Sequence, residues 1–206
     1  MKKIALVVVL ILTLSWLSGY AEEVVSPQSD FYYYDEVGVL SEETEGEIFF
    51  SNKLLYEDCG AQIVVVVINS TGSYSIEDYC IKLFNQWGIG DAEKNNGFLL
   101  LLAIQDDDYY ACPGLGLEPQ LSTTMIKALL DGCLEDDFVA KRYDRGVKKF
   151  YEAIFAYMAM VYHSDITVQD GIKMYEDYKA ESSATDFKWA QLSWNELMLL
   201  LQRNEG

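Results

Sequence analysis

Residues 61–68 read AQIVVVVI and residues 98–104 read FLLLLAI, and these two apolar stretches decide the fold. Each is a short, continuous run bounded by turn residues, which is typical of a strand covered on both faces of a sheet. Between them, Ser75 and Asp78 form a helix-capping pattern, and apolar side chains recur at helical spacing up to Gly88. A strand, a helix and a second strand in this order predict two parallel strands joined by a right-handed crossover.

The flanking segments extend this alternation on both sides. An aromatic strand comes first, followed by a helix that Ser41 caps and Gly60 ends. The remaining expected elements are a strand at 31–34, a turn at 105–108, an antiparallel hairpin strand at 109–112 that ends at Pro113, a helix at 125–133 with Ser122 or Thr123 near its cap, and a long helix at 147–161. The predicted fold is therefore α/β, a three-layer α-β-α arrangement with a small mixed sheet of about four strands and about four helices, plus a C-terminal helical extension.

The first 21 residues have the pattern of a secretory signal peptide. Lys2 and Lys3 precede an apolar run at residues 4–17, and Gly-Tyr-Ala at 19–21 follows as a cleavage pattern. We expect cleavage after Ala21 and an exported protein on the extracellular or cell-envelope side. If the leader is not cleaved, it remains as a membrane anchor. The expected divisions are a signal peptide at 1–21, one domain at 22–163 and an amphipathic helical extension at 164–206.

The extension carries an apolar stripe near its end. Trp194, Leu197, Met198 and Leu201 fall at i, i+3, i+4 and i+7, which predicts a helix with one apolar face. An interfacial membrane helix normally carries basic residues on its polar face, whereas acids outnumber bases in residues 164–206. We therefore expect this helix to dock on the domain or on a partner protein rather than on anionic lipid.

Charge and composition exclude several classes of protein. The chain has 33 Asp and Glu against 15 Lys and Arg, a formal charge of −18, and such a surface repels nucleic acid. Half of the residues are apolar, which excludes a disordered acidic tail. The single His makes Ser-His-Asp and Cys-His catalysis unfavourable, because both need an imidazole to move the proton.

The four cysteines, Cys59, Cys80, Cys112 and Cys133, leave two alternatives open. In an exported protein an even number permits two disulfides, in three connectivities. Cys80 and Cys133, however, fall on the apolar stripes of expected helices, where a free thiol behaves as a small hydrophobic group. Zinc is disfavoured, because the cysteines and the single His lack a recognised ligand spacing.

Five stretches, in their order and spacing, resemble the TPM domain. They are DEVGVLSEETEGEI from Asp35, GAQIVVVVI from Gly60, LFNQWGIGDAEKNNGFLLLL from Leu83, GLGLEPQLS from Gly114 and RYDRGV from Arg142. The family's usual Gly-x-Gly-Leu-Glu-Gly reads GLGLEP here, with Pro119 in the last position. The resemblance implies the three-layer fold. It also implies kinship with bacterial exported or membrane-tethered proteins, with a chloroplast-lumen protein described as an acid phosphatase, and with an animal modulator of acetylcholine receptors.

Topology and resemblance together indicate an oxygen-rich site at one edge of the sheet. The hairpin brings the loop that carries Asp91, Asn95 and Asn96 beside the loop that carries Gly114, Gly116 and Glu118. Carboxylate and amide oxygens suit Ca²⁺ or Mg²⁺, so the predicted metal ligands are Asp91, Asn96 and Glu118.

The opposite edge offers an alternative set. Asp35 precedes the first helix, Asp106 to Asp108 form the hairpin turn, and Asp144 begins the last long helix. The alternative ligands are Asp35 and Asp144, and the sequence does not choose between the edges.

Two functions remain open on this basis. The first is an exported, membrane-associated module at the cell envelope that binds Ca²⁺ or Mg²⁺ and a membrane or envelope protein. The alternative is a divalent-cation-dependent phosphatase of the acid phosphatase type, in which the cation offsets phosphate charge and polarises a water. The anionic surface and the scarcity of Arg and Lys near the first edge favour the binding module. We expect a monomer that does not bind nucleic acid.

Overall fold

The fold is built on a four-stranded mixed sheet. The computed structural model describes residues 24–27 and 32–182. The strands are β1 (Tyr33–Asp35), β2 (Gln62–Ile68), β3 (Gly97–Ala103) and β4 (Asp108–Pro113), and they lie side by side in chain order. The first three are parallel and β4 is antiparallel to β3, with Leu99 opposite Cys112. The crossover and the hairpin expected from the sequence are both present.

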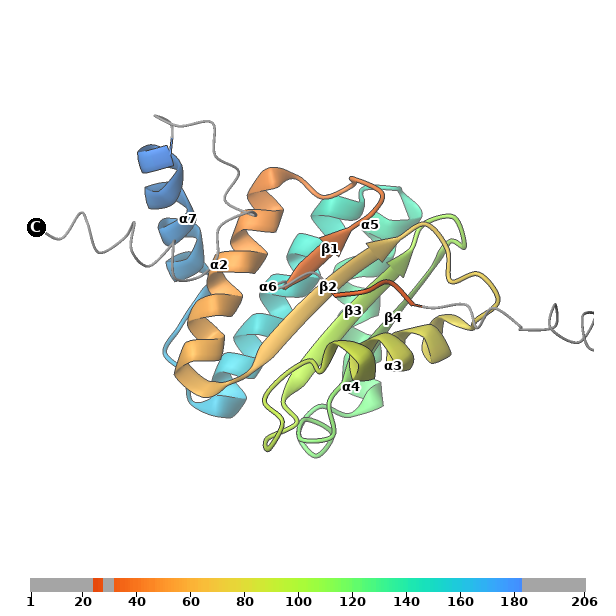
Figure 1. Ribbon diagram of the computed structural model, residues 1–206, viewed down its shortest axis with the longest axis horizontal. Helices are drawn as coiled ribbons and strands as arrows, with labels where there is room; N and C mark the ends of the chain where they lie inside the picture. The colour runs from red at the N-terminus through yellow and green to blue at the C-terminus, as the bar shows by residue number, and fades with distance from the viewer. Residues whose placement is uncertain (1–23, 28–31, 183–206) are drawn as a thin grey trace, which may run out of the picture.

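Helices cover the two faces of this sheet, so the predicted three-layer α/β fold is confirmed (Figure 1). In the view of Figure 1, α3 lies in front of the sheet and α6 behind it. The helices are α2 (Glu42–Cys59), α3 (Ile76–Trp87), α4 (Thr123–Leu129), α5 (Asp136–Val139), α6 (Tyr143–Tyr162) and α7 (Val168–Ser182). Within the described residues, no helix has the length and apolar character needed to cross a membrane.

The helix boundaries follow the capping residues. The side-chain oxygens of Ser41, Ser75 and Ser122 accept the backbone N–H of Thr44, Asp78 and Met125, at 3.2, 3.0 and 3.3 Å. Each cap satisfies an N–H that has no partner inside its helix. Gly60 and Gly88 end α2 and α3 in the left-handed conformation, which glycine adopts without strain.

The third helix differs from the expectation. The sequence predicts one helix over 125–133, but α4 ends at Leu129 and continues as a π-helical segment, Leu130–Glu135, which leads into α5. Widening of this kind alters the spacing of side chains along the helix. It moves Leu134 and Phe138 into the core, where both are buried.

The sheet has a hydrophobic core on each face. Along β2, Val65 and Val67 face the cluster that includes Phe150 and Ile154 of α6, whereas Val64 and Val66 face α3. Because both faces are covered, every residue from Ile63 to Ile68 is buried. This explains why the strand reads as a continuous apolar run instead of an alternating one.

A buried polar network joins α2, α6 and β2. The hydroxyl of Tyr151 lies 2.6 Å from Ser51 Oγ and accepts a hydrogen bond from Asn52 Nδ2 at 2.9 Å. Asn52 Oδ1 accepts the backbone N–H of Ile63 at 2.8 Å. Three elements that are distant in sequence are thereby held in register.

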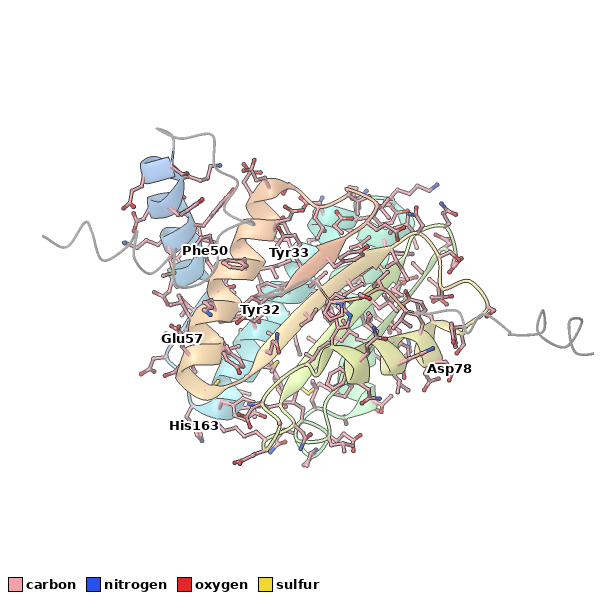
Figure 2. The ribbon with its side chains drawn as sticks, in the orientation of Figure 1. Tyr32, Tyr33, Phe50, Glu57, Asp78 and His163 are labelled. Carbon is pink, nitrogen blue, oxygen red and sulfur yellow. The ribbon has the colours of Figure 1, made fainter. Side chains whose placement is uncertain are left out.

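Helix α7 lies along α2, on the side away from the sheet (Figure 1). The ring of Phe50 on α2 lies 5.8 Å from that of Tyr175 and 5.7 Å from that of Tyr178; Figure 2 labels Phe50 on this helix. Close approach is possible because Gly46 faces the ring of Tyr175 and Gly171 faces the backbone of Ser51. The apolar stripe predicted at Trp194–Leu201 lies outside the described residues.

Candidate functional site

The two loops of the first predicted edge are packed together. The N–H of Gly114 donates to Gly97 O at 2.8 Å, and the N–H of Gly116 donates to Asn95 O at 3.0 Å. A Cβ atom at position 116 would lie 1.9 Å from Lys94 O, so the approach requires glycine there. The convergence predicted from the hairpin is therefore observed.

Two of the three predicted metal ligands at this edge, Asp91 and Asn96, accept hydrogen bonds from backbone amides of their own loop. Asp91 Oδ1 accepts the N–H groups of Glu93 and Lys94, both at 2.9 Å, and these hydrogen bonds lower the pKa of Asp91. Asn96 is fully buried, and its Oδ1 accepts the N–H of Asp91 at 2.9 Å. The ammonium group of Lys94 also lies at this edge, where it donates to Cys59 O at 2.6 Å.

Glu118, the third predicted ligand, lines a groove that does not include Asp91 or Asn96. Among residues 24–27 and 32–182, no three His, Cys, Asp or Glu side chains are grouped so that they would hold a metal ion together. A site at Asp91, Asn96 and Glu118 stays a prediction.

The alternative edge brings its two carboxylates to one loop. Asp35 Oδ1 accepts the N–H groups of Val37 and Gly38 at 3.0 and 2.8 Å, and its Oδ2 accepts that of Leu40 at 2.7 Å. Asp144 Oδ1 accepts the next amide, that of Ser41, at 2.7 Å. The two side chains thus hold consecutive amides of the β1–α2 loop. This loop lies at the carboxyl ends of the parallel strands, where open α/β sheets bind ligands.

Asp106, from the hairpin turn, contacts a different loop from this pair. Its carboxylate accepts the hydroxyl of Ser70 and the N–H of Thr71, both at 2.7 Å, and these bonds lower the pKa of Asp106. It therefore fixes the β2–α3 loop.

Sequence reasoning missed a buried carboxylate beside Asp144. Glu47 on α2 is 2% exposed, its Oε2 lies 2.5 Å from the ammonium group of Lys148, and its Oε1 is buried without a hydrogen-bond partner. Burial raises the pKa of Glu47, and the charges of Glu152 and Asp144 add to the rise. Its position three residues before the buried Phe50 places it on the inward face of α2, a signal that was available in the sequence.

A second carboxylate that sequence reasoning missed is Asp137, which forms ion pairs with three basic side chains. Its side chain is 2% exposed and lies 2.7 Å from Arg142 Nε, 2.6 Å from Lys149 Nζ and 3.5 Å from Arg145 Nε. The hydrogen bond from Lys149, with further contributions from Arg142 and Arg145, lowers the pKa of Asp137. Five of the 15 basic residues fall between 141 and 149, so Asp144 lies within a basic segment of the chain.

A groove of about 640 Å³ runs beside β4, the edge strand of the sheet, between α3 and α4. Its lining combines apolar side chains with a few polar groups, among them Tyr110, Cys112, Glu118, Ser122 and Lys127. This composition is typical of pockets that bind small molecules, active sites included.

Comparison with known proteins gives a family match and a shared fold. The family model described as the TPM domain matches residues 33–157. The N-terminal domain of a protein from P. gingivalis is 24% identical over 69% of this chain and 96% of its own, with a TM-score of 0.59. The BA42 protein from Bizionia argentinensis is 15% identical over 63% of this chain and 92% of its own, with a TM-score of 0.50. No curated protein matches the chain.

Proposed function

Because the chain belongs to the TPM domain family, we propose that it is an exported module of the cell envelope that binds a divalent cation and engages a membrane or envelope protein. The observation that carries this proposal is the pairing of Asp35 and Asp144 on consecutive amides of one loop, at the carboxyl ends of the parallel strands, where open α/β sheets generally bind ligands. The amino-terminal leader pattern supports export.

The donor groups at this edge suit a hard cation. Ca²⁺ and Mg²⁺ prefer carboxylate and carbonyl oxygens, and the edge supplies Asp35 and Asp144. Beside them, Glu47 has a buried oxygen without a hydrogen-bond partner. At the other edge, the positive charge of Lys94 acts on Asp91 and the amide of Asn96 is buried. We place the cation at the Asp35–Asp144 edge because Glu47 adds a third carboxylate there, with one oxygen bound to Lys148 and the other without a hydrogen-bond partner. We expect dissociation constants on the order of 10⁻⁴ to 10⁻³ M, as in extracellular modules.

Calcium titration followed by thermal unfolding tests the cation and its edge. Asp144→Asn keeps the shape of the side chain and removes its charge, and it is expected to abolish most of the calcium-induced rise in melting temperature. The matched control is the double variant Asp91→Asn with Glu118→Gln, which removes two charges at the other edge and is expected to keep that rise. The opposite pattern would move the site to Asp91 and Glu118, and no rise in the wild type would refute cation binding.

A cross-linking experiment tests the partner. Membranes that carry the exported protein are treated with a short lysine-directed cross-linker, with and without a calcium chelator. The proposal expects a discrete adduct with a membrane or envelope protein that weakens when the chelator is present or when Asp144 is replaced by Asn. Recovery of the uncross-linked protein alone would refute a stable partner.

The basic cluster favours one second candidate, a cation-dependent phosphatase. Arg142 and Arg145 flank Asp144 in the chain, and guanidinium groups bind phosphate in a bidentate manner. Hydrolysis of a phosphomonoester with Ca²⁺, Mg²⁺ or Mn²⁺, against a chelator control, tests this activity. Loss of the rate in Arg145→Gln, with a normal rate in the exposed control Lys173→Gln, would support the phosphatase. Absence of turnover would refute it.

A further inference from the structure

The four cysteines are divided between the two faces of the sheet. Cys80 and Cys112 belong to the core between α3 and the sheet, whereas Cys59 and Cys133 pack against the core on the face of α2 and α6. The sheet therefore blocks any pairing across it, because Cα atoms joined by a disulfide lie within about 7 Å of each other. Of the three connectivities that the sequence allows, only the one that pairs Cys80 with Cys112, and Cys59 with Cys133, joins cysteines on the same face of the sheet.

Cys80 and Cys112 point toward each other. Cys80 is on the sheet-facing side of α3 and is completely buried. Cys112 on β4 lies opposite Leu99, which belongs to the same core, so its side chain is directed toward α3. The two side chains pack in the same core, and α3 and β4 are in contact. In the structure all four cysteines are free.

The surroundings give only one member of the pair access to solvent. Cys112 lines the groove beside β4 and is half-buried. Cys80 does not line the groove, although its neighbour Ile81 does. The neighbouring thiol of Cys80 lowers the pKa of Cys112, and burial raises the pKa of Cys80. Thiolates are the nucleophiles in disulfide exchange, so the two residues are suited to different steps.

We propose that Cys80 and Cys112 form a thiol–disulfide pair, in which Cys112 reacts through the groove with a disulfide-bearing donor and Cys80 resolves the product into an intramolecular bond. In the first step the Cys112 thiolate attacks one donor sulfur, the donor S–S bond breaks, and one donor thiol leaves with a proton. In the second step the Cys80 thiol loses its proton and attacks Cys112 Sγ, and the second donor thiol leaves. The donor is reduced by two electrons and the protein gains one disulfide. The proposal is independent of cation binding.

Disulfide mapping of the full chain tests the pairing. The protein is equilibrated with glutathione disulfide without denaturant, the remaining thiols are alkylated, and the peptides are identified by mass spectrometry. We expect a peptide pair joined through Cys80 and Cys112, with Cys59 and Cys133 alkylated. A bridge that contains Cys59 or Cys133, or alkylation of all four cysteines, would overturn the proposal.

Single variants test the order of the steps. In Cys80→Ala the resolving thiol is absent, so Cys112 is expected to accumulate one glutathionyl group. In Cys112→Ala, Cys80 is expected to remain a thiol while the protein is folded, as checked by circular dichroism. The matched control, Cys59→Ala with Cys133→Ala, leaves the pair intact and is expected to form the bridge at the wild-type rate. Glutathionylation of Cys80 in folded Cys112→Ala, or none at Cys112 in Cys80→Ala, would refute the assigned order.

Discussion

Replacing Gly171 with alanine is expected to weaken the packing of α7 on α2. A Cβ atom at this position would lie 2.4 Å from the backbone N of Ser51 and 2.5 Å from its Cα, distances that real Cβ atoms do not adopt. Because backbone atoms cannot rotate away, α7 must shift outward. Overpacking costs about 1–3 kcal/mol and the higher helix propensity of alanine offsets about 1 kcal/mol, so we expect a net loss of up to about 2 kcal/mol in the free energy of unfolding.

The matched control for this change is Gly132→Ala. Gly132 lies in the π-helical segment, and a Cβ atom added there would have no neighbour within 4 Å, so alanine meets open space. This variant is expected to keep or slightly raise the free energy of unfolding. Urea denaturation measures both changes, and hydrogen exchange of α7 amides locates the effect. If Gly171→Ala is as stable as the wild type and α7 stays protected, the close contact with Ser51 does not exist.

Three further changes probe the core, the buried charge and the loop contact. Tyr151→Phe removes the hydroxyl that binds Ser51 and Asn52, so we expect urea denaturation to show a loss of about 1–3 kcal/mol, and an unchanged midpoint would contradict the network. Because the pKa of Asp137 is lowered in the folded protein, its charged form stabilises the fold. This stabilisation is fully present above the pKa of the unfolded chain, near 4, and is lost as the pH falls through the pKa of the folded protein. Asp137→Asn should therefore be less stable than the wild type above about pH 4, with a difference that narrows in acid, and a difference that is constant with pH would refute this. Gly116→Ala should lower the melting temperature, because its Cβ would meet Lys94 O, and an unchanged melting temperature would show that the loops do not pack.

The fold could be predicted because local signals and hydrophobic patterning agree. The runs at 61–68 and 98–104 are strands, and the caps at Ser41 and Ser75 begin α2 and α3 as expected. The first strand, predicted at 31–34, is Tyr33–Asp35 in the structure, which is the part that pairs with β2. The π-helical widening after α4 could not be anticipated, since apolar spacing does not reveal a single extra residue per turn.

The candidate site was harder to predict because it depends on which polar atoms are already satisfied. Asp91, Asn96, Asp35 and Asp144 are all at turns or helix starts, and backbone amides use their oxygens in ways that composition cannot show. The burial of Glu47 depends on the distance between α2 and α6, which only the assembled structure gives. The division of the cysteines was available in principle, because residues 80 and 112 follow the alternation and the helical period of their elements.

The order of the strands in the sheet also has a consequence for vectorial synthesis. Each strand pairs with the one that left the ribosome just before it, so the sheet grows from one side as the chain emerges. Helix α6, however, ends about 60 residues after β3. The apolar face that includes Phe98 and Leu100 is therefore covered by α6 only after those intervening residues have been synthesised. At about 5–20 residues per second this delay is roughly 3–12 s. During that interval the nascent chain presents a paired sheet with one incompletely covered face, which is the surface a holdase chaperone binds.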